Sequence, residues 1–265
     1  MTSRPYPTLI VTPVDAHVLK VELNRPEVLN AISTQMGHDL LALWLQLTAQ
    51  PGPTRCIVLT GTGDKAFCAG GDLKERDGMS APEWQAQHEL FERTYVALME
   101  LPVPVIAAVN GIAYGGGLEL ALACDFAYAA QDARFALSET RLGIMPGGCG
   151  TQTLARAAGE RRAKELIFSG QPFSASEGVQ WGVFNRSCEP RTTLAEAIAT
   201  AQAIASNGPL AVRQAKKSIH YGLQTDLLSG YRFEIEAYNR LVDTDDRREG
   251  VRAFNEKRAP VFRGQ

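Results

Sequence analysis

The first two thirds of the chain alternate short apolar runs with segments of helical periodicity. Six runs rich in β-branched and aromatic residues predict strands at Thr8–Thr12, His17–Leu23, Arg55–Thr60, Val105–Val109, Phe126–Ala129 and Arg134–Leu137. Apolar residues at helical spacing predict helices over Ser33–Gln50 and Pro82–Glu100. This alternation indicates an α/β fold with parallel strands joined by helical crossovers, and functional residues are then expected in loops at the strand ends.

From about Thr192 onward the strand signals disappear and only helical patterns follow. They predict helices over Leu194–Ser206, Pro209–Tyr221, Asp226–Val242 and Asp245–Lys257. We therefore expect a core over residues 1–195 and a helical region over residues 196–265 that packs on the core or on another subunit.

The positive and negative charges of the chain are nearly balanced, and this limits which classes of binding partner are expected. The 265 residues include 27 Lys+Arg and 29 Asp+Glu, a formal net charge of −2. Such a chain has no global field for a polyanion, so nucleic acid is not expected as its main partner. The basic residues Arg156, Arg161, Arg162 and Lys164 could serve RNA binding, but without interleaved aromatics they favour a solvated helix face. The most apolar stretch, Leu101–Ala130, is interrupted by prolines, glycines and acids, so no membrane partner is expected.

The cysteines and histidines favour neither disulfides nor metal. The five cysteines are widely spaced without a CxxC pair, and the N-terminus lacks an export signal, so we expect reduced thiols in a cytoplasmic protein. Cys68 and Cys149 lie near predicted loops without a partnered histidine, which favours packing over a nucleophilic role. The four histidines show no ligand spacing, so zinc is not expected.

Glycine is enriched, at 24 residues, and the excess falls in two runs. In the first, the strand from Arg55 is followed by Gly61-x-Gly63-x-x-Ala66, which resembles a dinucleotide-binding fingerprint. That fingerprint requires a long helix opening at its third small residue, whereas Gly70 and Gly71 would end any helix there. An NAD-dependent oxidoreductase is therefore disfavoured.

The second run places Gly115, Gly116 and Gly117 after the strand Val105–Val109 and before a short apolar helix. Glycines let backbone approach a ligand closely, and the first N–H groups of a helix have no partner within it. The pattern predicts a site for developing negative charge. Close helix–strand packing is the alternative, and a phosphate-binding loop is excluded by the missing Gly-Lys-Ser/Thr.

Two glutamates accompany this run. Glu119 lies in the first turn of the predicted apolar helix, where burial would raise its pKa and the helix N-terminus would lower it. Glu139 follows the strand Arg134–Leu137, so chain reversal could bring both to one cleft. Either glutamate alone suits a surface salt bridge. Together, beside backbone donors, they indicate proton transfer next to a carbonyl.

At these residues the sequence resembles the crotonase, or enoyl-CoA hydratase/isomerase, superfamily, nearly end to end. The segments that carry the resemblance are Leu23–Ala31, Ala66–Lys74, Ala113–Glu119, Glu139–Gly147 and Asp245–Gly250. The resemblance implies a spiral of ββα units with a C-terminal helical trimerisation region, forming a homotrimer or a dimer of trimers.

The resemblance also implies roles for the glycines and glutamates. The N–H groups of Gly71 and Gly116 should form an oxyanion hole, and Glu119 and Glu139 should be the acid–base pair of a hydratase. The implied reaction is addition of water across the 2,3-double bond of an enoyl-CoA. No metal or redox cofactor is implied, since coenzyme A enters as part of the thioester substrate. The alternatives are a Δ3,Δ2-enoyl-CoA isomerase using chiefly Glu139, another acyl-CoA enzyme of the superfamily, and a non-catalytic or RNA-binding homologue.

By the same resemblance, several further residues should contact coenzyme A, although each basic one could equally be a surface charge. They are Arg25, Ala69, Gly70, Asp72, Leu73, Lys74 and, from a neighbouring subunit, Phe254 and Lys257. Within the family, segments such as Asp72–Arg76 look most like those of 3-methylglutaconyl-CoA hydratases. Cys149 departs from the Ala or Gly that the family usually has at this position. Trp84, Phe91 and Tyr95 could line the acyl pocket, but their helical spacing favours core packing.

Overall fold

Six strands form the larger of two sheets in the computed structural model, which describes residues 6–265. The spatial order is β1-β2-β3-β5-β7-β10, and every neighbouring pair is parallel except the antiparallel pair β1–β2. The bounds are β1 Leu9–Pro13, β2 Val18–Leu23, β3 Cys56–Gly61, β5 Val105–Val109, β7 Phe126–Ala130 and β10 Arg186–Cys188. The predicted parallel α/β architecture is confirmed.

Four short strands form the second sheet, in the order β4-β6-β8-β9. Their bounds are β4 Ala66–Cys68, β6 Ile112–Tyr114, β8 Arg134–Ala136 and β9 Phe173–Ser174. Of these strands only β8 was predicted, from the apolar run Arg134–Leu137 that extends past it. The strands β4, β6 and β9 have two or three residues and lack such a run, so they show no period of two. Since β4 begins at Ala66, no helix opens where the dinucleotide fingerprint requires one, and the oxidoreductase interpretation is excluded.

The helices begin at clear capping signals. Ser33 accepts the N–H of Met36 at the start of α1, and Ser80 forms a capping box with Glu83 at the start of α3. The bounds are α1 Thr34–Ala49, α2 Leu73–Arg76, α3 Ala81–Met99, α4 Gly116–Leu122, α5 Gly150–Ala158, α6 Glu160–Ser169, α7 Ala175–Gln180, α8 Thr193–Ala205, α9 Pro209–Gly222, α10 Leu227–Val242 and α11 Asp245–Asn255, with 3₁₀ turns at η1 Pro26–Val28 and η2 Glu139–Leu142. None of the helices in residues 6–265 is long and apolar enough to cross a membrane.

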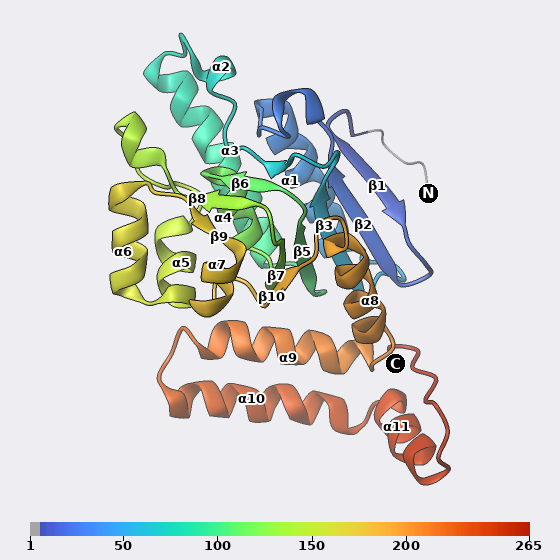
Figure 1. Cartoon of the computed structure of the whole chain (residues 1–265). Coiled ribbons are helices and arrows are strands. Elements are labelled where there is room, and N and C mark those ends of the chain that lie inside the picture. The colour runs from blue at the N-terminus through green and yellow to red at the C-terminus, as the bar shows by residue number, and fades with distance from the viewer. Residues whose placement is uncertain (1–5) are drawn as a thin grey trace.

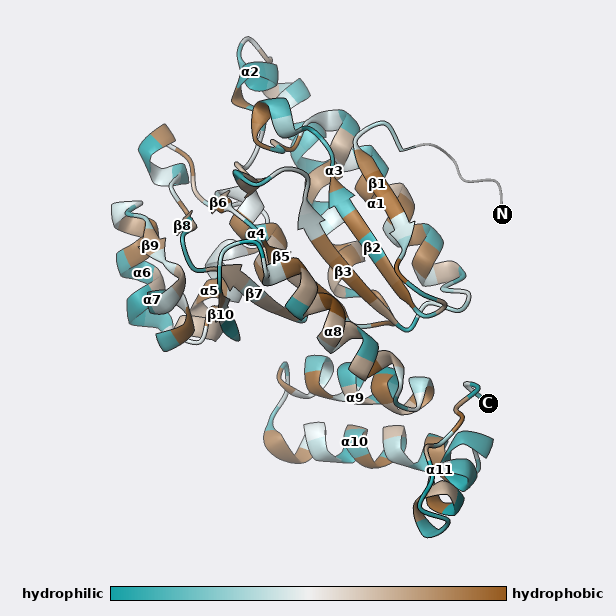
Figure 2. Cartoon of the chain, turned by 45° about the vertical axis from the view of Figure 1, so that its right-hand side comes forward, coloured by the Kyte–Doolittle hydropathy of each residue, from teal (hydrophilic) through white to brown (hydrophobic). Residues whose placement is uncertain are grey.

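The larger sheet is covered on both faces, which explains why its central strands are apolar without alternation (Figure 2). Every residue of β3 is buried. Ile57 and Leu59 face the main core, together with residues of α1 and α3, whereas Val58 packs with Ala197 and Ala201 of α8 on the opposite face. The two faces therefore form two separate apolar clusters.

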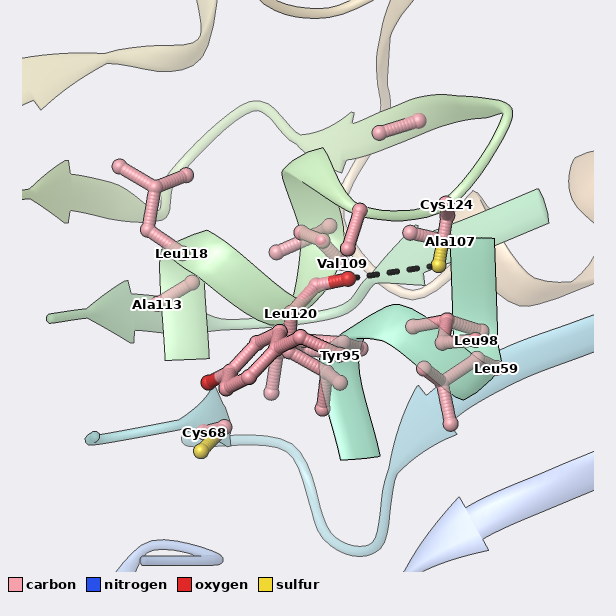
Figure 3. Packing of buried hydrophobic residues seen from close by; sticks show 14 of the residues in the cluster. Leu59, Cys68, Tyr95, Leu98, Ala107, Val109, Ala113, Leu118, Leu120 and Cys124 are labelled. Atoms are coloured by element: carbon pink, nitrogen blue, oxygen red, sulfur yellow. Dashed lines mark hydrogen bonds between the residues drawn. The ribbon is translucent and has the colours of Figure 1, made fainter. Parts of the chain in front are cut away.

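Helix α4 joins the two sheets through this main core. Figure 3 shows Leu118 and Leu120 of α4 among buried side chains that include Tyr95 and Leu98 of α3. The thiol of Cys124 lies 3.4 Å from the carbonyl oxygen of Leu120, at the end of the same helix. This packing fixes α4, whose first turn carries Gly116 and Glu119.

The last three helices extend away from the sheets. Helix α8 packs against β3 and β5, whereas α9 and α10 pack mainly against each other below the sheets, with α11 beyond them (Figures 1 and 2). The division at residues 195 and 196 stays a prediction, and the packing places α8 with the sheets. We call α9, α10 and α11 together the helical extension.

Candidate active site

A cavity of about 850 Å³ opens between α2, α3, the start of α4 and the segment from Ser138 to Gly148. Gly71, Gly116, Glu119 and Glu139 all line it. The chain reversal expected between the two glutamates is thus confirmed, because helix α4 and strands β7 and β8 fold back to one cavity.

Gly71 and Gly116 bring two backbone segments side by side. A Cβ atom placed on Gly116 would lie 3.8 Å from the nitrogen of Gly71, and one placed on Gly70 would lie 2.8 Å from the carbonyl oxygen of Tyr114. Gly115 turns the chain into α4 with φ +51°, a conformation that favours glycine. Within residues 6–265, neither the Gly71 nor the Gly116 N–H donates a hydrogen bond. Both donors are therefore available to an oxygen in the cavity.

Glu119 is held rigidly at the back of the cavity. It is 3% exposed, and its Oε1 accepts the N–H groups of Gly148 and Gly150, each at 2.8 Å. Burial raises the pKa of Glu119 to about 7; the nearby charge of Glu139 adds to the rise and the two N–H donors oppose it. Near neutral pH this carboxyl group is thus able both to take up and to release a proton.

Glu139 begins η2 at the other side of the same cavity. Burial raises its pKa as well. Its Oε2 is buried without a hydrogen-bond partner in residues 6–265, and its Oε1 lies beside Gly115, 3.1 Å from a Cβ placed there. The two carboxyl groups differ, since Glu119 is anchored by backbone donors and Glu139 keeps a free oxygen next to the turn that precedes Gly116.

Tyr95 supports the same turn of helix. Its hydroxyl donates to the carbonyl oxygen of Gly116 at 2.7 Å, and its ring lines the cavity. Burial raises the pKa of Tyr95 well above its usual range, so the phenol stays protonated and keeps donating.

The residues expected to contact coenzyme A are only partly brought together. Ala69, Gly70 and Leu73 line the cavity. Asp72 caps α2 and forms an ion pair with Arg25 at 2.9 Å, and Lys74 is exposed on α2.

Two of these residues lie elsewhere in the chain. Phe254, 83% exposed, lies in the last turn of α11, and Lys257 follows the end of this helix. Helix α11 lies away from α2 and α4 in both views (Figures 1 and 2). Their contact with coenzyme A from a neighbouring subunit stays a prediction.

One face of α3 supplies cavity residues that sequence reasoning missed or assigned elsewhere. Trp84, Phe91 and Tyr95, for which core packing was favoured, line the cavity, although Phe91 and Tyr95 also belong to the core cluster. His88 lies four residues after Trp84 on the same helical stripe and lines the cavity too. A histidine at helical spacing within an otherwise aromatic stripe is the sequence signal that could have identified it as a cavity residue. Arg76, at the end of α2, also lines the cavity and was not among the expected site residues.

The cysteines are free, as expected, and four of the five are buried. Burial raises the pKa of Cys68 to about 12. Cys149 caps α5 with φ +75°, and burial followed by the charge of Glu119 raises its pKa too. Both stay protonated thiols, which makes them poor nucleophiles.

The basic cluster on α5 and α6 is largely neutralised by its neighbours. Arg162 pairs with Glu165 at 2.6 Å, Lys164 pairs with Glu160, and Arg162 packs over the ring of Trp181. This arrangement agrees with a solvated helix face.

The cavity thus combines two available backbone donors with two carboxyl groups of raised pKa in an α/β protein. This is the arrangement of an enzyme that stabilises negative charge on oxygen while it moves protons. The model of the enoyl-CoA hydratase/isomerase family matches residues 14–265, and the chain belongs to this family.

Proteins that are similar to this chain in sequence and in structure carry names from the same family. The chain is 44% identical to YngF of Bacillus subtilis, named as an enoyl-CoA hydratase/isomerase, over 97% of this chain and 98% of that one. It is 37% identical to the (E)-benzylidenesuccinyl-CoA hydratase of Thauera aromatica, over 95% and 97%. The crystal structure of an enoyl-CoA hydratase from Bacillus anthracis matches with a TM-score of 0.95 and 44% identity, covering 97% of this chain and all of that one. The expected crotonase fold is confirmed.

Proposed function

We propose that the protein is an enoyl-CoA hydratase, which adds water across the 2,3-double bond of an acyl-CoA thioester. The observation that carries this proposal is the shared cavity of Glu119, Glu139, Gly71 and Gly116. A hydratase uses two proton-transfer groups, and an isomerase that moves one proton has less need of Glu119 held by two backbone donors. The relative from Thauera aromatica is itself named as a hydratase.

In the proposed reaction the thioester oxygen accepts the N–H groups of Gly71 and Gly116. Ionised Glu119 takes a proton from water as the water oxygen adds to C3, and the electron pair of the double bond moves toward C2 and the thioester. The two N–H groups stabilise the resulting enolate-like charge. Protonated Glu139 delivers its proton to C2, and a proton passed from Glu119 to Glu139 restores the starting state. The raised pKa of Glu119, about 7, supports a role in proton transfer near neutral pH, and burial raises the pKa of Glu139 as well.

Coenzyme A takes part in this proposal only as the carrier of the acyl group, with no resident cofactor. The loop residues Ala69, Gly70 and Leu73 are proposed to receive it beside Gly71. We keep the cytoplasm as the proposed compartment, which the unpaired state of all five cysteines supports.

We propose further that the helical extension assembles the subunits into a trimer or a dimer of trimers. Its exposed large apolar side chains support this, because an isolated soluble chain seldom exposes so many in one region. They are Ile219, Tyr221, Leu223, Leu227, Leu228, Tyr231, Ile235, Tyr238, Val242, Val251 and Phe254.

The test is turnover of short, branched and aromatic 2-enoyl-CoAs by the purified protein, followed as loss of the conjugated thioester absorbance. We expect at least one to be hydrated. If none is consumed, while a 3-enoyl-CoA gains the conjugated absorbance, the protein is an isomerase instead. If neither set reacts, the catalytic proposal is wrong and a silent homologue is favoured.

A further inference from the structure

The turn that leads into α4 consists of three consecutive glycines, which do not hold one conformation by themselves. Gly115, Gly116 and Gly117 lack the Cβ atom that restricts the backbone of other residues. The backbone supplies two ties at Gly115, whose N–H donates to the carbonyl oxygen of Ala136 at 2.8 Å and whose carbonyl oxygen accepts the N–H of Glu119 at 3.0 Å. The N–H of Gly116, which is proposed to hold the thioester oxygen, therefore needs a further contact to keep its direction.

The hydroxyl of Tyr95 supplies a contact at Gly116 itself. It donates to the carbonyl oxygen of Gly116 at 2.7 Å, and within residues 6–265 no other side chain forms a hydrogen bond with the backbone of the three glycines. The N–H and the carbonyl group of Gly116 are joined only through its Cα atom, so fixing the carbonyl limits the directions that the N–H takes. A Cβ placed on Gly116 would lie 3.1 Å from the Tyr95 hydroxyl oxygen and 3.8 Å from the nitrogen of Gly71. The hydroxyl thus acts where the two proposed donors come together.

Tyr95 is itself fixed from two sides. It is 5% exposed and belongs to the main core, and Figure 3 shows its hydroxyl directed away from Leu98 and Leu59. On the side of Glu119, a Cβ placed on Gly148 would lie 2.6 Å from the ring carbon Cε2 and 2.7 Å from Cζ, so the ring lies directly against the backbone of Gly148. A side chain packed this closely keeps its rotamer, and its hydroxyl keeps its place.

The state of the hydroxyl is suited to donating a hydrogen bond. Burial, followed by the charge of Glu119, raises the pKa of Tyr95 well above its usual range, so the phenol stays protonated. The other ionisable groups that face it are Cys68 and Glu139, which add to the rise, and Arg76, which opposes it. The phenolic proton is directed at the Gly116 carbonyl oxygen, so it serves the turn and not the acyl group.

We propose that Tyr95 is a positioning residue of the reaction, whose hydroxyl keeps the N–H of Gly116 directed at the thioester oxygen. The inference rests on the proposed function, because it concerns the oxyanion donors of the same site. A donor stabilises developing charge best when it already points to the place where the charge forms. Since that charge is larger in the enolate-like transition state than in the bound thioester, Tyr95 should contribute to kcat more than to KM.

The kinetic test is Tyr95→Phe, which removes the hydroxyl and keeps the ring against Gly148. We expect kcat for the fastest enoyl-CoA of the panel to fall by about tenfold and KM to stay within about twofold of wild type. The matched control is Tyr128→Phe. Tyr128 of β7 is 6% exposed, and its hydroxyl pairs with Thr200 Oγ1 at 3.1 Å in the apolar cluster on the opposite face of the larger sheet. Both variants lose one buried hydroxyl, and only the Tyr95 variant should lose rate.

A bound chromophore reports the direction of the donors without any turnover. In para-dimethylaminocinnamoyl-CoA the amino group is conjugated with the thioester carbonyl, so hydrogen bonds to the carbonyl oxygen move its absorbance to longer wavelength. The extended conjugation also disfavours addition of water. We expect a red shift on binding to wild type and to Tyr128→Phe, and about half of that shift with Tyr95→Phe, because one of the two donors is no longer held in line.

The two measurements separate this inference from the proposed reaction. A red shift with Tyr95→Phe equal to that of wild type would overturn the positioning role, even if kcat falls. A fall of kcat shared by Tyr128→Phe would overturn it as well, since it would reflect the loss of any buried hydroxyl. A wild-type shift that is halved in Tyr95→Phe, without hydration of any enoyl-CoA, would support the positioning role and count against the hydratase proposal alone. No shift in the wild type would exclude the oxyanion hole, and with it both proposals.

Discussion

The two-sheet part of the molecule and the helical extension bury their side chains very differently. In the sheets, whole strands such as β3 and β5 are buried, and α8 closes the second face. In the extension, α9 buries only Pro209 and α10 only Ala237 among their described residues. The first region completes its own core, whereas the second leaves large apolar side chains on its surface.

The extension is instead held together by charge at its far end. Glu249 of α11 accepts hydrogen bonds from Arg252, Arg258 and the N–H of Val261, and these hold its pKa well below the usual range. Asp246 likewise accepts the N–H groups of Arg263 and Gly264. These polar contacts fix the path of the chain near α11, whereas the apolar side chains of α9 and α10 stay exposed. We infer that the sheets carry the chemistry and the extension carries assembly.

The largest expected effect is a loss of catalysis that leaves the assembly of the subunits unchanged. Glu119→Gln removes the ionisable group with little change in shape, so hydration should fall by about 10²–10⁴-fold. Steady-state rates with the preferred enoyl-CoA measure the loss, and light scattering should show an unchanged mass. A variant of near wild-type rate would exclude Glu119 from proton transfer.

The next largest effect concerns the extension alone. Leu227 is 85% exposed at the start of α10, and Leu223 is exposed at the end of α9. Changing both to glutamate should dissociate the assembly, because charges do not tolerate burial in an apolar interface. Light scattering checks the mass, with Leu45→Glu on α1 as the control at an exposed leucine of the sheet region. A wild-type protein that is already monomeric would contradict the assembly role.

A smaller effect links the active site to stability. The pKa of Glu119 rises from 4.5 to about 7 on folding, so between these values the native state holds more protons than the unfolded state. This carboxyl group therefore costs stability as pH rises, by up to about 3 kcal/mol above pH 7. Glu119→Gln should melt several degrees above wild type at pH 8 and close to it at pH 4.5. Calorimetric melting at both pH values tests this, and a destabilised variant at pH 8 would contradict it.

The smallest effect concerns the helix that forms one wall of the cavity. Ser80→Ala removes the N-cap of α3, which should cost about 1 kcal/mol of stability. Since the cap is exposed and far along the helix from Tyr95, kcat should stay near that of wild type. Urea unfolding measures the cost, and Thr244→Ala at the cap of α11 makes the same change in the extension. A cap effect on kcat would show that α3 moves during the reaction.

The regular elements of the sheet region were predictable because their signals are local. Six strands follow from apolar runs, and α1 and α3 from helical spacing with Ser or Pro at their starts. The strands β4, β6, β9 and β10 escaped prediction, because two or three residues pair only when another strand is already in place. Helix α2 has four residues and depends on Asp72 as its cap.

Some residues of the candidate site could be predicted from the sequence, and others could not. Glu119 stood out as a charge in an apolar run, and Gly116 as part of three glycines before a helix. Gly148 and Gly150, which hold Glu119, gave no such signal, since their role depends on a contact across about thirty residues of chain. Arg76 was not among the expected site residues, and only the folded chain shows its contacts with Trp84 and Gln87 at the cavity.

Local signals were enough to predict the α/β class, the helical extension, and the glycines and glutamates of the proposed active site, because periodicity and residue type can be seen in the sequence without the fold. Tertiary structure alone decided that Glu119 and Glu139 share a cavity and that burial raises both pKa values. The fold also brings the guanidinium of Arg76 beside Gly71, with its Nε donating to Gln87. Burial and pairing depend on which distant segments meet, and desolvation, which sets the energy of a charge, exists only once they have met.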